Sequence, residues 1–232
     1  MKKNGFTLAE VLITLGIIGV VAAITLPTLI QNHKKQVYVN GLKKAISTSQ
    51  NMLKQMQADE EASSVGTTKL FTDGICNKWN DDGSHNHSCE DNYGNPTVFE
   101  NIIPKYLKTV KICKNDTCPL YIAPTLLDNG KFSIPSYARK ELPLRYPFTD
   151  VTQVLGFYAT DGIIYYIAPY SSWNNTPGVL IGVDVNGNNP PNMSGRDYFQ
   201  FILSGSGKLC EPPLDYCVYI RDIIDAGWKM NY

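Results

Sequence analysis

The chain has 232 residues, with 21 basic and 21 acidic side chains, 18% charged residues and 11% aromatic residues. This composition excludes a disordered chain and favours a packed globular part, either one domain with an appendage or two small domains. Because the net charge is zero, no strongly basic field favours nucleic acid as the principal partner, and no acidic field favours a cationic substrate.

The N-terminal segment from Phe6 to Ile30 is apolar and has a single ionisable side chain, Glu10. A helix of roughly 25 residues is about 37 Å long, enough to cross a hydrocarbon core of about 30 Å. The segment differs from a secretory signal, because its basic leader is only MKKNG and no small-residue cleavage site follows Ile30. We therefore predict a membrane-spanning helix over 6–30.

The helical pattern continues over 31–58 with an apolar stripe on one face. We expect this amphipathic half to lie on the downstream domain. Pro27 should kink or locally melt the helix, and Asn40-Gly41 is a second weak point. The residues of the stripe are Tyr38, Leu42, Ala45, Ser49, Met52 and Met56, with Ile46 and Leu53 widening it.

The string KKNGFTLAEVLITL, in which Gly5 precedes Phe6 and Glu10 follows four residues later, resembles the N-terminal cleavage and methylation motif of type IV pilins and type II secretion pseudopilins. The resemblance implies that a prepilin peptidase cuts between Gly5 and Phe6 and methylates the new Phe6 amine. It also implies that Glu10 pairs with the amino terminus of a neighbouring subunit. Pro27 lies where many of these proteins have a helix-bending proline.

The resemblance further implies a domain plan and a location. Residues 1–5 would be the leader, 6–30 the transmembrane and filament-core helix, 31–58 its amphipathic continuation and 59–232 the exported globular domain. The protein would be a single-pass inner-membrane protein with its N-terminus in the cytoplasm, and then part of an extracytoplasmic filament. Its partners would be prepilin peptidase, other pilin or pseudopilin subunits, the inner-membrane assembly platform and membrane lipid.

The charge arrangement agrees with these roles. Glu10 lies about 6 Å along the helix from Phe6, near the interface, where the helix dipole and a free amine both favour a carboxylate. In a dry filament core the amine and the carboxylate each need a partner, and pairing between chains also fixes the register. The alternative interpretation is a plain signal anchor whose glutamate is tolerated at the interface.

The cysteines form three pairs that are close in sequence, which predicts three short-range disulfides and an oxidising compartment. A zinc site built from the first pair with His85 and His87 is the alternative, but its spacing fits no common motif and export favours a disulfide. The six residues are Cys76, Cys89, Cys113, Cys118, Cys210 and Cys217.

The exported domain should be α+β, with the long N-terminal helix packed on an antiparallel sheet and disulfide-bonded loops, as in the pilin plan. Helical spacing interrupted by Pro104 predicts short helices over 95–111. From Val151 the period is that of strands, with a hairpin at Thr160-Asp161-Gly162 and about four strands in all. The tail should form a short helix ending near Gly227. We expect Trp228 and Tyr232 to pack, and exposure for a partner is the alternative.

The loop between the last two predicted strands is rich in oxygen ligands of the kind that Ca²⁺ prefers. It resembles the calcium-binding loop near the C-terminus of some pseudopilins, although it lacks the bidentate glutamate of an EF-hand. Tight turns need the same residue types without any metal, so a plain turn is the alternative. The candidate ligands are Asp184, Asn186, Asn188, Asn192 and Asp197.

No catalytic residues are predicted. The three histidines, His33, His85 and His87, have no nucleophile motif near them, and neither G-x-S-x-G nor H-E-x-x-H occurs. We predict a structural subunit that needs no cofactor, with structural calcium as the one candidate ion. The alternatives are a membrane-anchored exported enzyme or binding protein, and a DNA-uptake (competence) pilin, although nucleic acid is not an expected partner.

Overall fold

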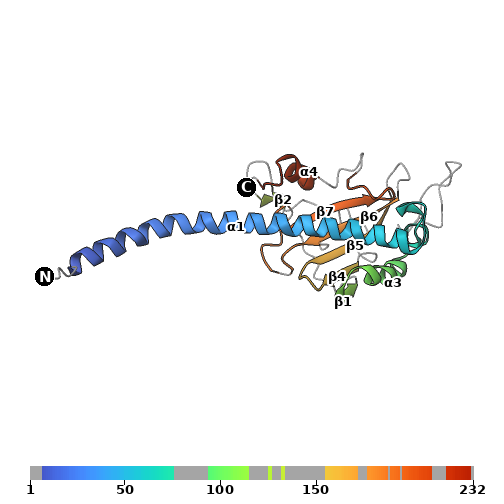
Figure 1. Ribbon diagram of the computed structural model, residues 1–232, viewed down its shortest axis with the longest axis horizontal. Helices are drawn as coiled ribbons and strands as arrows, with labels where there is room; N and C mark the ends of the chain where they lie inside the picture. The colour runs from blue at the N-terminus through green and yellow to red at the C-terminus, as the bar shows by residue number, and fades with distance from the viewer. Residues whose placement is uncertain are drawn as a thin grey trace, which may run out of the picture. The chain divides into compact units, whose positions relative to one another are not determined.

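The computed structural model describes residues 7–75, 94–114, 125–126, 132–133, 155–171, 177–187, 189–193, 195–210 and 218–230. The chain divides into two compact units, Met1–Val37 and Tyr38–Tyr232. Helix α1, Leu8–Asp59, contributes to both units (Figure 1). Gly5 and Phe6, with the rest of the predicted leader, lie outside the described residues.

Helix α1 is continuous through Pro27 and Gly41, so neither residue melts it. A bend at Pro27 stays a prediction. From Tyr38 onward one face of α1 is buried in the core of the globular unit, which confirms the predicted stripe. The structure adds Val39 to the stripe, and the complete buried set of α1 is Tyr38, Val39, Leu42, Ala45, Ile46, Ser49, Met52, Leu53 and Met56.

Two short helices follow α1. The 3-10 helix η1, Val65–Thr67, leads into α2, Lys69–Thr72, whose first N–H is bonded to the Glu60 carboxylate at 2.7 Å. The backbone of Gly66 meets that of Gly205 with an N–H to carbonyl bond of 2.7 Å. A Cβ added at Gly66 would lie 3.2 Å from the Gly205 carbonyl oxygen, so a side chain here would require a shift of a few tenths of an ångström in this contact.

Helix α3, Pro96–Tyr106, begins where the side chain of Asn95 accepts from the Thr97 N–H at 3.1 Å. Asn95 as N-cap and Pro96 in the first turn are favourable start residues. The predicted short helices over 95–111 are only partly correct. The helix includes Pro104 in its last turn, and Thr109–Lys114 forms strand β1 instead.

The main sheet is antiparallel and has five strands in the order β1-β4-β5-β6-β7. Its other strands are β4 (Leu155–Ala159), β5 (Ile164–Ser171), β6 (Pro177–Asp184) and β7 (Tyr198–Ser204). The fold is therefore α+β, as predicted, with one more strand than expected. A separate two-stranded sheet pairs β2 (Thr125–Leu126) with β3 (Phe132–Ser133).

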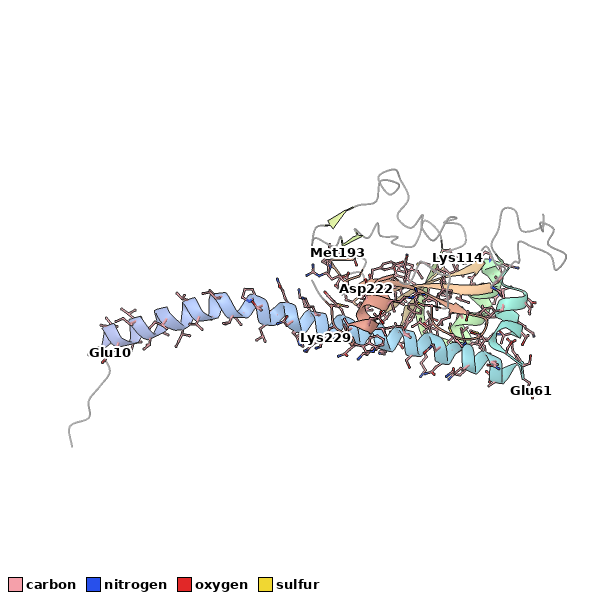
Figure 2. All side chains as sticks on the ribbon, turned by 90° about the horizontal axis from the view of Figure 1, so that it is seen from above. Glu10, Glu61, Lys114, Met193, Asp222 and Lys229 are labelled. Carbon is pink, nitrogen blue, oxygen red and sulfur yellow. The ribbon has the colours of Figure 1, made fainter. Side chains whose placement is uncertain are left out.

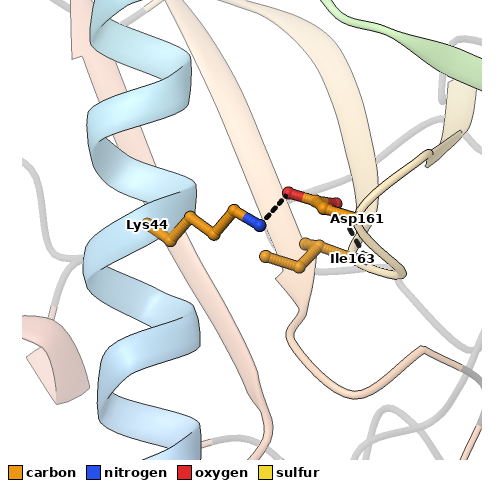
Figure 3. A network of polar contacts seen from close by, with 3 residues as sticks. All are labelled: Lys44, Asp161 and Ile163. Carbon is orange, nitrogen blue, oxygen red and sulfur yellow. Dashed lines mark hydrogen bonds and ion pairs between the residues drawn. The ribbon is translucent and has the colours of Figure 1, made fainter.

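The hairpin between β4 and β5 turns where Asp161-Gly162 predicted it. Gly162 has a φ of 86°, and its N–H donates to the Ala159 carbonyl at 3.1 Å. Asp161 stabilises the turn by accepting from the Ile163 N–H at 3.1 Å, and it also reaches Lys44 of α1, whose Nζ lies 3.0 Å from Asp161 Oδ2 (Figure 3). The hairpin tip is thus tied to the helix.

The core lies between α1 and one face of the sheet, where large aromatic side chains such as Tyr165, Phe199 and Phe201 are buried. Residues on the other face, among them Tyr166 and Tyr198, are equally buried. The inner strands are therefore apolar on both faces, and they form near-continuous hydrophobic runs.

The tail forms helix α4, Val218–Asp225, followed by Gly227 with a φ of 67°. Trp228 packs against the core and lies under Lys43 of α1, whose Nζ is 4.8 Å from the ring centroid. This confirms the predicted packing of Trp228, whereas Tyr232 lies outside the described residues. The contact also joins the last described segment to the helix.

Cys113 and Cys210 are both disulfide-bonded. The other four cysteines, and with them the predicted local pairing, lie outside the described residues, as do His85 and His87 of the zinc alternative.

Candidate functional site

The first candidate site is the start of α1, where Thr7 and Glu10 form a capping box. The Thr7 N–H and the Thr7 hydroxyl both donate to Glu10 Oε2 at 2.8 Å, and the Glu10 N–H donates to Thr7 Oγ1 at 3.3 Å. This reciprocal arrangement satisfies N–H groups that a helix start otherwise leaves without partners. Sequence reasoning missed the role of Thr7, although the T-x-x-E spacing was the signal for it.

Glu10 keeps one carboxylate oxygen for another partner. Both bonds from Thr7 end on Oε2, so Oε1 accepts no hydrogen bond from the described residues. The helix dipole favours negative charge at this end. The arrangement therefore holds the carboxylate at the helix start with an acceptor atom available for a cationic group.

The part of α1 after Glu10 exposes apolar side chains that no described residue of its own unit covers (Figure 2). Leu8 is 78% exposed and Ile24 is 70% exposed. The hydroxyl groups of Thr14 and Thr25 turn back to helix carbonyls, to Glu10 and Val21 at 2.9 Å each. These two threonines therefore add few free polar groups to the surface.

By length and composition, α1 is the helix in the described part of the chain that could cross a membrane, and none of its most apolar stretch is buried within the protein. The core helix of a soluble protein and a signal sequence can pass the same test. The spacing of Gly5, Phe6 and Glu10 at its start distinguishes a membrane-spanning helix from these two alternatives.

The second candidate site is the loop of residues 184–197, which we call the Asx loop. Asp184 and Asp197 are both fully buried. Asp197 accepts three bonds, from the Met193 N–H at 2.6 Å, the Asn192 N–H at 2.8 Å and Asn186 Nδ2 at 3.1 Å. The structure thus brings four of the five predicted ligands into one loop, and Asn188 lies outside the described residues.

The electrostatics of the Asx loop favour a positive partner. Burial raises the pKa of the Asp184 carboxyl to about 8, with a further increase from the Asp197 charge and an opposing hydrogen bond from the Asn186 N–H. Oδ1 of Asn186 is buried and has no hydrogen-bond partner among the residues that the structure describes. A buried oxygen without a partner costs about 1–3 kcal/mol, which a cation or a water would recover.

These residues fit a Ca²⁺ ion in part. Asn186 Oδ1 and Asp184 supply hard oxygen ligands, and Asp197 has used three of roughly four acceptor positions. In the described part of the chain no group of three or more His, Cys, Asp or Glu side chains is placed to hold a metal ion. Amide oxygens, backbone carbonyls and water would have to complete the coordination.

Comparison with protein families finds a match to the prokaryotic N-terminal methylation motif over residues 1–26. No curated protein and no solved structure matches the chain. The chain thus carries the prepilin signature of type IV pilins and pseudopilins on a fold of one long helix and an antiparallel sheet. These features are pilin-like, and they include an N-terminal helix that is long and apolar enough to anchor a protein in a membrane. The motif implies processing by prepilin peptidase and polymerisation with other pilin subunits.

Proposed function

We propose that this protein is a structural subunit of a type IV pilus or a type II secretion pseudopilus and has no enzymatic role. The observation that carries the proposal is Glu10, a carboxylate held at the start of an apolar, uncovered helix with Oε1 available. A signal anchor requires no such group, whereas a helix that packs against identical helices requires a partner for each buried charge.

In this proposal prepilin peptidase cuts after Gly5 and methylates Phe6. Cleavage creates the new amine one residue before Thr7, which donates to the Glu10 carboxylate. The amine of a neighbouring subunit pairs with Glu10, and that pairing sets the register of one helix against the next. The exposed side chains of residues 8–30 then form the filament core, which replaces lipid as their apolar surroundings.

Mass spectrometry of the native protein tests the processing step. We expect the mature chain to begin with methylated Phe6. An intact Met1 in the assembled protein, or cleavage beyond Ile30, would contradict the proposal. Either result would favour the alternative of a signal-anchored exported protein.

Glu10→Ala tests the assembly step, with Glu10→Gln as the matched isosteric control for charge. We expect both variants to insert and to be processed, but to be recovered in sheared filaments at a small fraction of the parent level. Incorporation of Glu10→Ala at the parent level would remove the assembly role of Glu10.

We also propose that the Asx loop binds one structural Ca²⁺ ion through Asp184, Asn186, Asn192 and Asp197, with Asn188 as a further candidate. The buried and unsatisfied Asn186 Oδ1 supports this proposal, as does the raised pKa of Asp184. Bound calcium would supply the positive charge that two buried carboxylates favour.

A further inference from the structure

The Asx loop meets α1 at Gly41. Val185, the residue that follows β6, lies so close to the helix that a Cβ added at Gly41 would be 2.8 Å from Val185 Cβ and 3.4 Å from both Val185 methyl carbons. Real Cβ atoms essentially never approach below 3.0 Å. The glycine that weakens the helix in isolation is therefore needed here for close packing.

Tyr38, one turn before Gly41, faces the same loop. Its side chain is buried, with 6% of the residue exposed. Burial raises the pKa of Tyr38, and the charge of Asp197 raises it further, so the phenol lies within the electrostatic reach of the loop. Two positions that are one turn apart on α1 are thus in contact with or close to residues 185–197.

The loop is held in shape from within. The Val185 N–H donates to the Asp197 carbonyl at 2.9 Å, and the Asp197 carboxylate accepts from Asn186, Asn192 and Met193. These internal hydrogen bonds make the loop rigid, so the position of its contact with α1 is fixed. The loop contacts α1 close to the boundary between the two units, which lies between Val37 and Tyr38.

We infer that the Asx loop is a latch that fixes the point at which α1 joins the globular unit. With the latch in place, the helix is part of the globular unit from Tyr38 onward. Without it, residues 38–42 behave like the free helix before them, and the free segment becomes longer by about one turn. The latch does not depend on the filament function proposed above.

Hydrogen exchange of the full chain in detergent micelles, followed by mass spectrometry, tests the latch. We expect Gly41→Ala to speed exchange over 38–42 at least about fivefold while residues 47–56 of the same helix change by less than about twofold. The sign is diagnostic, because alanine normally stabilises a helix relative to glycine. Gly19→Ala is the matched control, since a Cβ at Gly19 meets nothing within 4 Å; it should slow local exchange or leave it unchanged.

Val185→Ala is the second variant, because it removes the two methyl groups that face Gly41 and creates no clash. It should speed exchange over 38–42 in the same direction and by a smaller factor. Unchanged exchange over 38–42 in Val185→Ala would overturn the latch. An equal increase over 47–56 in both variants would also overturn it, because that result indicates general loss of packing. The exchange is measured on the protein in micelles, without filament assembly. Neither outcome therefore tests the proposed filament function.

Discussion

Lys44 and Asp161 join α1 to the tip of the β4–β5 hairpin, with Nζ 3.0 Å from Oδ2. The Lys44 side chain is 56% exposed and that of Asp161 is 20% exposed. Water therefore screens the pair in part, and its net contribution to stability should be small. The second role of Asp161, accepting from the Ile163 N–H, is local to the turn.

We expect Lys44→Met to lower the free energy of unfolding by about 0.5–1 kcal/mol. Asp161→Ala should cost more, because it also removes the acceptor for Ile163. Denaturant unfolding of the full chain in micelles measures both, and Lys54→Met, at an exposed lysine of the same helix, is the control. A coupling energy well above about 1 kcal/mol in the double-mutant cycle would show that the pair is less screened than its exposure indicates.

Thr7→Val should weaken the start of α1. The substitution keeps the side-chain shape but removes the hydroxyl that donates to Glu10 Oε2 and accepts from the Glu10 N–H. Loss of such a cap typically costs about 1 kcal/mol. Exchange of the first amides of the helix in micelles should therefore become roughly fivefold faster. Thr14→Val is the control, because its hydroxyl bonds only to carbonyls of its own helix; the same effect in both variants would exclude a capping role.

The stability of the globular unit should depend on pH through Asp184 in calcium-free buffer. Because its pKa is raised to about 8, the folded state binds a proton that the unfolded state releases above about pH 4. The free energy of unfolding should therefore fall as the pH rises from about 4 to about 8, and level off above that. Asp184→Asn should flatten this part of the profile, whereas Asp225→Asn, at an exposed position, should not. An identical slope in parent and Asp184→Asn would contradict the burial argument.

Calcium should raise the melting temperature of the parent protein above its value in chelator. At a hundredfold excess over the dissociation constant the gain would be about 2.7 kcal/mol, or very roughly 5–10 °C for a chain of this size. Asp184→Ala should lose the calcium-dependent increase, and Asp222→Ala, in α4, should retain it. Equal melting of the parent in calcium and in chelator would end the calcium proposal while leaving the pilin proposal intact.

Local pattern was enough for much of the fold. The buried stripe of α1 follows from its helical period, and the β4–β5 turn follows from Asp161-Gly162, because both depend on residues that are near one another in sequence. Strand β1 was not predicted, because the apolar residues of 95–111 have helical spacing. Its pairing partner, β4, lies some 40 residues further along the chain. Pairing between distant segments leaves little trace in one of them alone.

Residue types and their spacing are enough to assign the N-terminal segment, which is an apolar helix with a single carboxylate at a fixed distance from a glycine. The roles of Gly41 and Asp184 depend instead on the folded structure. The sequence predicts that Gly41 weakens the helix, and the structure shows that Gly41 allows Val185 to pack closely against α1. The sequence predicts a polar loop around Asp184, and the structure shows that this side chain is fully buried. Packing and burial are set by neighbours that the fold brings from far along the chain, so no local pattern could reveal them.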